Sequence, residues 1–243
     1  MGYNSHDETE WLKVTISLDS MRTPNDLAPL DRCGWLAEQP APLQAWFAGH
    51  GRWRTFAAGE DLYDAGDAAD GVFGLAAGAL DVTLSLTDAG PVAVHRGEVG
   101  FWIGDLALLA EGERLVSVRA RRRSRVYVVP GRAVRALLQA QPEHWPRFYA
   151  LTHRNTRTAL HLLAEALTLS PDERVCRRLL QLVEPDGTVA VTQAELAELL
   201  GVTRATVRRA LKRLAAEGAV ATGYGRLRVC DRRRLERLAE PPA

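Results

Sequence analysis

Residues 192–214 read TQAELAELLGVTRATVRRALKRL, and they carry the strongest structural signal in the chain. Thr192 and Glu195 have the spacing of a capping box, in which a hydroxyl and a carboxylate each bind one free amide at a helix N-terminus. Leucines four residues apart then give this helix an apolar face. Gly201 suits a sharp turn, because glycine adopts positive φ without steric cost. The stretch predicts two short helices joined by a tight turn.

The second predicted helix has an apolar face and a basic face. Thr203 can cap its N-terminus, and Val207, Leu211 and Leu214 form an apolar stripe. The rest of its surface is cationic, with side chains from Arg204, Arg208, Arg209, Lys212 and Arg213. In a helix-turn-helix, such a helix enters the major groove of DNA and its first residues reach base edges. A basic helix face is also a common solvated surface, so the flanking sequence must decide.

A basic hairpin is predicted directly after this helix. Residues 220–229, VATGYGRLRV, read as two strands around a glycine-rich tip, which is the pattern of a wing beside a helix-turn-helix. Residues 203–237 contain eleven basic and three acidic side chains, a local charge of +8, whereas the whole chain carries +1. This asymmetry is typical of a nucleic-acid module joined to another domain. We therefore expect the chain to bind double-stranded DNA.

The composition is that of an ordinary globular chain. The 243 residues suggest one or two domains, with 47% hydrophobic and 25% charged residues. No apolar run reaches the roughly 18–20 residues that span a bilayer, and the N-terminal sequence lacks the pattern of a secretion signal, so we expect a cytoplasmic protein. Cys33, Cys176 and Cys230 are far apart and odd in number, so neither a disulfide framework nor a zinc site is predicted.

Short strands punctuated by glycine are predicted between residues 52 and 129. Residues 80–86, LDVTLSL, alternate strictly, as in a strand with one buried face. Closely spaced strands and turns of this kind favour a small antiparallel barrel or roll. Residues 1–34 are polar and irregular, and we interpret them as a loose N-terminal arm.

A long helix is predicted between Trp145 and Leu169. Its seam alternates steps of three and four and comprises Trp145, Phe148, Thr152, Asn155, Ala159, Leu162, Ala166 and Leu169. This period favours two helices that pair along their length, although a helix packed on its own domain has the same period. We expect pairing, because a two-fold reader of DNA needs two recognition helices about 34 Å apart.

The predicted chain order is a roll with glycine at its turns, then a long helix, then a winged helix-turn-helix. This order resembles that of the Crp/Fnr family of bacterial transcription regulators. The segments that carry the resemblance are AGEDLYDAGD at 58–67, VFGLAAGAL at 72–80, and IGDLALL at 103–109 followed by Arg114. The last of them is similar to the phosphate-binding cassette of cyclic-nucleotide domains.

This resemblance covers about residues 46–237 and implies an α+β fold. The expected parts are an N-terminal double-stranded β-helix of the jelly-roll type at 35–140, which acts as a sensor, a dimerisation helix at 141–170 and a winged helix-turn-helix at 171–243. It also implies a homodimer on a palindromic promoter site, with RNA polymerase as a further partner.

Positions that contact DNA in the family can be matched to residues of this chain. Arg204 and Arg209 match the positions that read guanine through O6 and N7. Ala205 stands where the family has a glutamate that accepts from cytosine, so the half-site should differ. The expected DNA-binding residues are Thr192, Gln193, Thr203, Arg204, Ala205, Thr206, Arg208, Arg209, Lys212, Tyr224 and Arg226. Capping alone is the alternative role of Thr192 and Thr203.

The cassette implies an effector pocket made of Gly104, Asp105, Leu106, Ala107, Arg114, Leu115 and Ala159. In the family, helix amides and an arginine bind a cyclic phosphate, and a carboxylate accepts from the ribose hydroxyl. Here aspartate replaces the usual glutamate, and Leu115 replaces a serine or threonine. Ala159 and Leu160 replace the Thr-Ser pair that receives adenine. Losing one such contact costs on the order of 1–3 kcal/mol, so we expect an effector other than cAMP.

Several alternatives stay open at this point. The protein could still respond to cAMP or cGMP, or Arg114 and Asp105 could form an internal salt bridge. An iron–sulfur cluster needs four cysteines, and haem would need one of His50, His95, His144, His153 or His161 as a ligand. No cofactor is therefore predicted. Enzyme motifs such as a Walker loop, GxSxG or HExxH are absent from the sequence. A ligand-binding module that regulates a partner protein is the remaining alternative.

Overall fold

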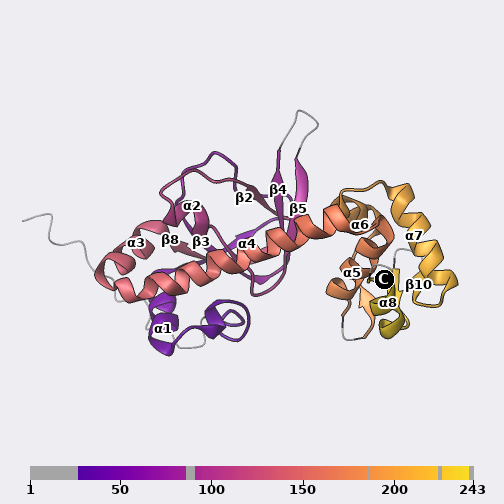
Figure 1. Cartoon of the computed structure of the whole chain (residues 1–243). Helices are drawn as coiled ribbons and strands as arrows, with labels where there is room; N and C mark the ends of the chain where they lie inside the picture. The colour runs from indigo at the N-terminus through magenta and orange to yellow at the C-terminus, as the bar shows by residue number, and fades with distance from the viewer. Residues whose placement is uncertain (1–26, 86–90, 185, 224–225, 241–243) are drawn as a thin grey trace, which may run out of the picture.

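The computed structural model describes residues 27–85, 91–184, 186–223 and 226–240, and the fold consists of two groups of elements joined by one long helix (Figure 1). The first group comprises the 3-10 helix η1 (Leu36–Glu38), α1 (Ala41–His50), β1 (Arg52–Phe56), β2 (Asp61–Tyr63), β3 (Gly71–Ala77), β4 (Leu80–Leu84), β5 (Val92–Gly97), β6 (Trp102–Ile103), α2 (Asp105–Leu109), β7 (Ser117–Ala120), β8 (Ser124–Pro130), α3 (Gly131–Ala140) and the 3-10 helix η2 (Pro142–His144). The long helix is α4 (Trp145–Thr168). The second group comprises α5 (Pro171–Leu182), β9 (Thr188–Val189), α6 (Gln193–Leu200), α7 (Arg204–Ala216), β10 (Val220–Gly223), β11 (Arg226–Val229) and α8 (Arg232–Leu238).

The strands of the first group form the predicted antiparallel roll. One sheet has the order β1-β8-β3-β6 and the other has the order β2-β7-β4-β5, and every pairing is antiparallel. Between the sheets lies an apolar core that includes Phe56, Phe73, Leu80 and Val126. The alternating segment at 80–86 supplies β4, which ends at Leu84. This architecture confirms the expected mixed α and β fold with a β-roll.

Helices close one end of the roll around a cluster of aromatic rings. Trp35 makes edge contacts with Phe47 and Trp102 at centroid distances of 5.5 and 5.8 Å. Its indole Nε1 donates to the carbonyl oxygen of Arg147 at 2.9 Å, which ties the segment before η1 to the start of α4. Aromatic pairs of this geometry add about 0.5–1.5 kcal/mol each beyond the area they bury.

The loose arm predicted for residues 1–34 does not extend to residue 34, because the last part of this segment packs on the domain. Leu27 and Leu30 are only 2% and 0% exposed and belong to the same core as Trp35. Their spacing of three places both leucines on one side of a turn, so this segment packs on the domain rather than forming a loose arm. Residues 1–26 lie outside the described residues.

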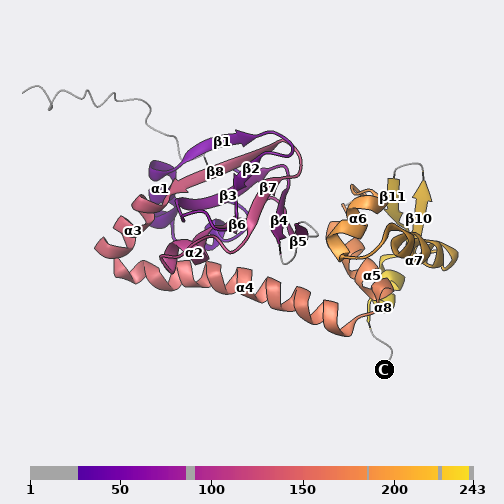
Figure 2. The ribbon, with the colours of Figure 1, turned by 90° about the horizontal axis from the view of Figure 1, so that it is seen from above.

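The second group consists of four helices and a small sheet, and it contains the predicted helix-turn-helix and hairpin. Its sheet has the order β10-β11-β9, and its core contains Leu179, Leu196, Val207 and Leu211. A capping box between Ser170 and Glu173 begins α5. Figure 2 shows α4 running beneath the roll and ending at α5, so that the helix connects the two groups. In the described part of the chain, no helix has both the length and the apolar character needed to cross a bilayer.

The predicted seam of α4 faces the chain's own roll over much of its length. Phe148 is fully buried. Thr152 Oγ1 donates to Asp105 at 2.6 Å, and Asn155 Nδ2 donates to the Asp105 carboxylate at 3.0 Å and to the Trp102 carbonyl at 3.1 Å. Phe148 is thus too buried to lie in a dimer seam, whereas for the half-buried Thr152 and Asn155 pairing with a second copy stays a prediction. Both faces of the helix carry side chains at steps of three and four, so the period could not identify the correct one.

The other seam residues are distributed between the cavity described below and solvent. Ala159, Leu162 and Ala166 line that cavity, Leu169 caps the helix C-terminus, and Trp145 is 44% exposed. A second apolar stripe of α4 is left open to solvent and comprises Tyr149, Leu160, Leu163 and Leu167, which are 70%, 58%, 54% and 77% exposed.

Candidate functional site

The two helices of the predicted helix-turn-helix are held by local hydrogen bonds. The Thr192 hydroxyl accepts from the Glu195 amide at 3.2 Å, and the Glu195 carboxylate accepts from the Thr192 amide at 2.7 Å, which is the predicted capping box. Gly201 ends α6 with φ of 62°, a left-handed conformation that favours glycine. Thr203 then caps α7, since its hydroxyl accepts from the Thr206 amide at 3.1 Å. Thr192 and Thr203 therefore have structural roles whether or not they also contact DNA.

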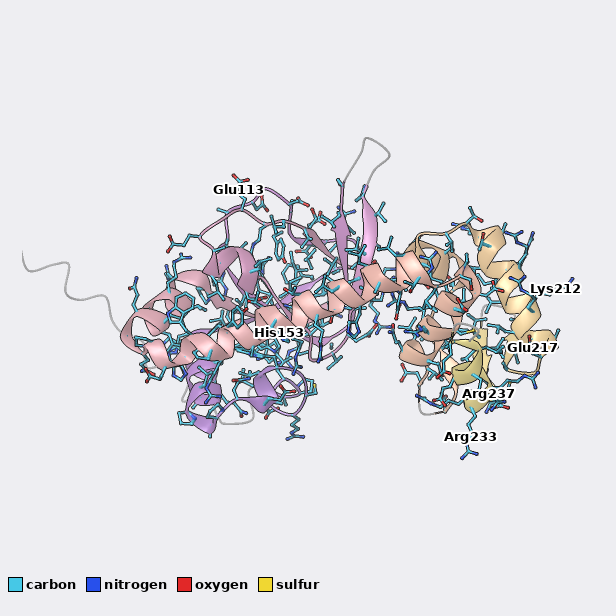
Figure 3. All side chains as sticks on the ribbon, in the orientation of Figure 1. Glu113, His153, Lys212, Glu217, Arg233 and Arg237 are labelled. Carbon is cyan, nitrogen blue, oxygen red and sulfur yellow. The ribbon has the colours of Figure 1, made fainter. Side chains whose placement is uncertain are left out.

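One face of α7 is buried and the opposite face is basic and free. Val207, Ala210, Leu211 and Leu214 are buried against the rest of the winged unit. Arg204, Ala205, Arg208, Arg209 and Lys212 are exposed. Within the described residues, none of these four basic side chains forms a hydrogen bond or an ion pair, whereas Arg213 pairs with Asp172 of α5. Lys212 projects from the outer side of α7, away from the roll (Figure 3).

The wing is present as an antiparallel hairpin. Strand β10 pairs with β11 from Val220–Val229 to Gly223–Arg226, and β11 also pairs with β9. Tyr224 lies outside the described residues, and for Arg226 only the backbone is described. Gln193 is exposed at the first position of α6. The predicted DNA-binding residues with a described side chain thus lie on α7 or at the helix N-termini.

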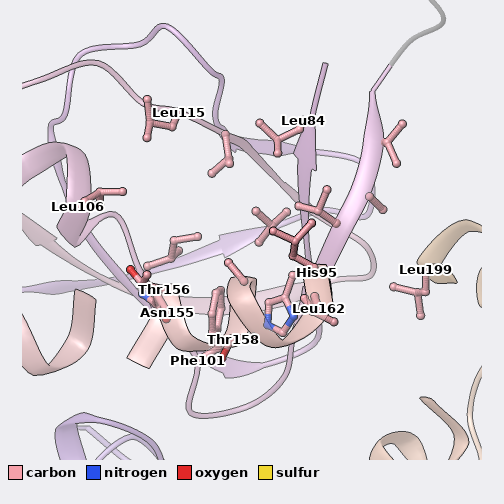
Figure 4. Close-up of a pocket in the computed structure, with 18 of the residues that line it drawn as sticks. Leu84, His95, Phe101, Leu106, Leu115, Asn155, Thr156, Thr158, Leu162 and Leu199 are labelled. Atoms are coloured by element: carbon pink, nitrogen blue, oxygen red, sulfur yellow. The ribbon is translucent and has the colours of Figure 1, made fainter. Parts of the chain in front are cut away.

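A cavity of about 700 Å³ lies between the roll, α4 and the winged unit. All seven predicted pocket residues line it. Most of its other walls are apolar and come from β4, β5, α4 and α6, with Leu84, Leu162 and Leu199 among them, and from Phe101 before β6 (Figure 4). In size and character it is a small-molecule pocket.

Arg114 is already held by the protein at one side of this cavity. Its Nη1 donates to the Gly104 carbonyl at 2.8 Å, and its Nη2 donates to Asp70 at 2.9 Å and to the Gly71 carbonyl at 2.8 Å. The guanidinium also stacks on the ring of Tyr63, 4.2 Å from its centroid. Gly104 has φ of 102°, and a Cβ there would lie 2.8 Å from Arg114 Nη1, so this approach requires glycine.

Asp105 is also engaged, but not by Arg114. Its carboxylate is 1% exposed and accepts the hydrogen bonds from Thr152 and Asn155 described above. Burial raises the pKa of Asp105, and those hydrogen bonds partly offset the shift. The alternative of a direct salt bridge between Arg114 and Asp105 is therefore wrong, because each side chain has its own partners. Both residues nevertheless serve the structure of the roll.

Three basic side chains at the other end of the cavity were not predicted from the sequence. Arg174 and Arg178 of α5 and His95 of β5 line it, although about eighty positions separate the histidine from the arginines. Burial, aided by the charge of Arg178, lowers the pKa of His95 to about 4. No sequence motif links these positions, and only the contact between α5, α6 and β5 brings them to one cavity.

The described residues hold no cluster of metal-ligating side chains, and the thiols of Cys33 and Cys176 have raised pKa values. Among the described residues, no group of three His, Cys, Asp or Glu side chains lies close enough to hold a metal ion. Burial and the charge of Asp31 raise the pKa of the Cys33 thiol, and burial foremost raises that of Cys176 to about 12. These two thiols are therefore protonated near neutral pH.

Comparisons with known families match both halves of the chain. Residues 53–141 match the cyclic nucleotide-binding domain, and residues 173–238 match the Crp-like helix-turn-helix domain. Together these two matches cover α3 and nearly all of the roll and of the winged unit.

Individual relatives agree with these matches. The cAMP-activated global transcriptional regulator CRP of Escherichia coli O6:H1 is 26% identical, over 72% of this chain and 88% of that protein. A solved CRP-family transcriptional regulator from Thermus thermophilus is 27% identical, with a TM-score of 0.63, and the match covers 76% of this chain and 96% of that one. FixK2 from Bradyrhizobium japonicum shares the fold, with a TM-score of 0.69, 21% identity and coverage of 79% and 99%.

Proposed function

Since this chain belongs to the Crp/Fnr family of bacterial transcription regulators, we propose that it binds a palindromic DNA site as a homodimer and contacts RNA polymerase there. The observation that carries the DNA contact is the free basic face of α7, where four cationic side chains have no partner among the described residues. Because these side chains have no partner to give up, they can contact phosphates and base edges without first breaking an ion pair. A protein with this partner acts in the cytoplasm, and that location is part of the proposal.

The exposed stripe of α4 supports the dimer. Leu160, Leu163 and Leu167 follow one another at steps of three and four and are more than half exposed. A monomer in water would keep these leucines hydrated, whereas two copies of α4 packed along their length bury them. This stripe replaces the seam predicted from the sequence as the proposed dimer surface.

The cavity supports an effector that is not a cyclic nucleotide. Both terminal nitrogens of Arg114 already bind protein oxygens, and Asp105 has both carboxylate oxygens occupied. Leu115, at the position of the family's phosphate-binding hydroxyl, is 65% exposed and offers no donor. A cyclic phosphate and ribose would therefore have to displace existing contacts. The regulator that does bind cAMP or cGMP remains the alternative.

The decisive experiment combines DNA selection with calorimetry. Purified full-length protein should select a palindromic duplex from a random pool and bind it with nanomolar affinity that falls steeply with salt, because each phosphate contact releases counterions. Titration with cAMP and cGMP should give no heat and leave DNA affinity unchanged. Failure to enrich any duplex contradicts the DNA proposal. Tight cAMP binding that switches on DNA affinity instead supports the alternative effector.

A further inference from the structure

The cavity ends at a pair of arginines whose charges the described protein does not fully satisfy. Arg178 is only 7% exposed, and within the described residues no hydrogen bond or ion pair engages its guanidinium. Arg174, one helical turn earlier on α5, donates from Nη1 to the Leu200 carbonyl at 3.2 Å, but its buried Nε has no partner. A buried cation without a hydrogen-bonded partner is costly, and a bound anion would remove that cost.

The neighbouring charges do not compensate Arg178. Burial lowers its pKa, and although Glu165 opposes this shift, that carboxylate already pairs with Arg177 at 3.4 Å. Arg96, which disfavours the charge on Arg178, is itself bound to Asp81 at 2.8 Å. This end of the cavity thus keeps a surplus of positive charge.

His95 adds a third nitrogen to the same end. Its Nδ1 is buried and has no partner among the described residues. Because its pKa is about 4, the ring is neutral near pH 7 and carries one N–H that can donate to an anion. Figure 4 shows the ring beside Leu162 of α4, facing the space that the pocket residues enclose.

Most of the remaining wall is apolar and partly open to water, although Thr156, Thr158 and Glu165 of α4 also line the cavity. Leu106 and Leu115 are 47% and 65% exposed, and Val92 is 50% exposed. Leu84 and Leu162 continue the apolar wall towards His95 (Figure 4). A ligand that fits both regions has a hydrocarbon body and one negative charge at its end.

We propose that this cavity binds a small amphipathic carboxylic acid. Its carboxylate accepts hydrogen bonds from Arg174 and Arg178, and its hydrocarbon body lies against the leucines of the roll and α4. The inference rests on the proposed role of the cavity as the effector site. It also explains how an effector could reach the DNA-binding unit, since α5 carries both arginines and is part of that unit.

The carboxylate is assigned to the α5 end rather than to Arg114. Arg114 is neutralised by Asp70 and donates to two carbonyl oxygens, so an anion there would compete with contacts already made. Arg178 has no such contacts to lose. We therefore place the ligand's carboxylate at Arg178, whose guanidinium is free, rather than at Arg114.

Decanoate, at concentrations below micelle formation, is the probe for this assignment, and isothermal titration calorimetry of the full-length protein is the measurement. Arg178→Met should weaken decanoate binding at least tenfold, because a charge-assisted hydrogen bond is lost. Gln181→Met is the control on the same helix, since this exposed residue does not line the cavity, and it should stay within twofold. Decan-1-ol, which has the same chain without the charge, should bind the wild type at least tenfold more weakly than decanoate.

The Arg178 variant should fold, because it removes a buried charge and keeps a side chain of similar length; its melting temperature without ligand should equal or exceed that of the wild type. Arg174→Gln gives an independent test and should weaken decanoate several-fold. The inference is overturned if the wild type does not bind decanoate, if Arg178→Met binds it equally well, or if decan-1-ol binds as tightly. Binding of decyl phosphate but not decanoate would overturn the carboxylate class. Because the titrations contain no DNA, their failure leaves the DNA-binding proposal intact, and DNA selection tests that proposal separately.

Discussion

Single residues of α7 divide into those that hold the helix and those that are free to read DNA. Arg213 is fixed to Asp172, and Thr203 caps the helix. Arg204 follows the cap directly and has an exposed side chain without a partner in the described residues. The first residues of a recognition helix lie nearest the base edges, so Arg204 is the side chain whose loss should alter sequence preference most.

Replacing Arg204 with alanine should cost about 1–3 kcal/mol of specific binding and relax the preference at one base pair of each half-site. Fluorescence anisotropy with the selected duplex and its single-base variants measures both effects. Arg233→Ala is the control, because this exposed arginine lies on α8 rather than α7 (Figure 3). It should leave base preference unchanged. Equal discrimination by wild type and Arg204→Ala would show that α7 does not read that base.

His95 should make the stability of the fold depend on pH. Its pKa is about 4 in the folded protein, against about 6.5 for an unfolded histidine, so the unfolded chain binds the additional proton between these values. The free energy of unfolding should therefore fall as the pH drops from about 6.5 towards 4, by at most about 1.4 kcal/mol per pH unit.

Urea unfolding at a series of pH values tests this, with the variant His95→Gln expected to show a shallower slope in that window. His153→Gln is the control, since His153 is exposed on α4 (Figure 3). The same slope in wild type and His95→Gln would mean that another group causes the pH dependence.

At the scale of elements, the sequence predicted where a helix begins better than it predicted which element a helix packs against. The capping box of Thr192 and Glu195 is local, so four residues suffice to predict where α6 begins. The face of α4 is different, because side chains at steps of three and four occur on two sides of it. Thr152 turned out to bind Asp105 of the same chain, which is 47 positions away. No local pattern contains that information, so the helical period alone could not identify the face that meets the roll.

The exposed stripe of α4 gives a prediction about assembly. Leu160→Glu places a charge where two copies are proposed to meet. The dimer would lose buried apolar surface and would have to desolvate the carboxylate. The substitution should therefore weaken the dimer at least a hundredfold, about 2.7 kcal/mol. Sedimentation velocity across a concentration series measures this. His161→Glu, on the same helix and also exposed but off the stripe, should leave the dimer intact. A Leu160→Glu protein that sediments as the wild type does would locate the dimer contact elsewhere.

At the scale of the whole molecule, the winged unit is fastened to the roll through α6. Arg121, between β7 and β8, donates to Glu195 at 2.8 Å and to Glu198 at 3.2 Å, and lies 3.8 Å from Asp81. Burial alone would raise the pKa of Glu195, but hydrogen bonds from Thr192 and Arg121 hold it below its ordinary value. One carboxylate thus both caps a helix of the helix-turn-helix and joins it to the roll. These partners are 74 positions apart in the chain, so the sequence could not predict this junction.

Removing this junction should loosen α6 without unfolding it. Since exposed ion pairs contribute up to about 1 kcal/mol, Arg121→Ala should speed hydrogen exchange of the Glu195 and Leu196 amides, which bind Thr192, about fivefold, while the capping box keeps the helix formed. The neighbouring Arg122 donates to the Gly78 carbonyl and not to α6, so Arg122→Ala should leave that exchange unchanged. High salt should reproduce the loosening in the wild type, because the pairs are partly exposed and are screened. Equal protection in both variants would mean that apolar contacts between β5 and α6, rather than Arg121, hold the DNA-binding unit against the roll.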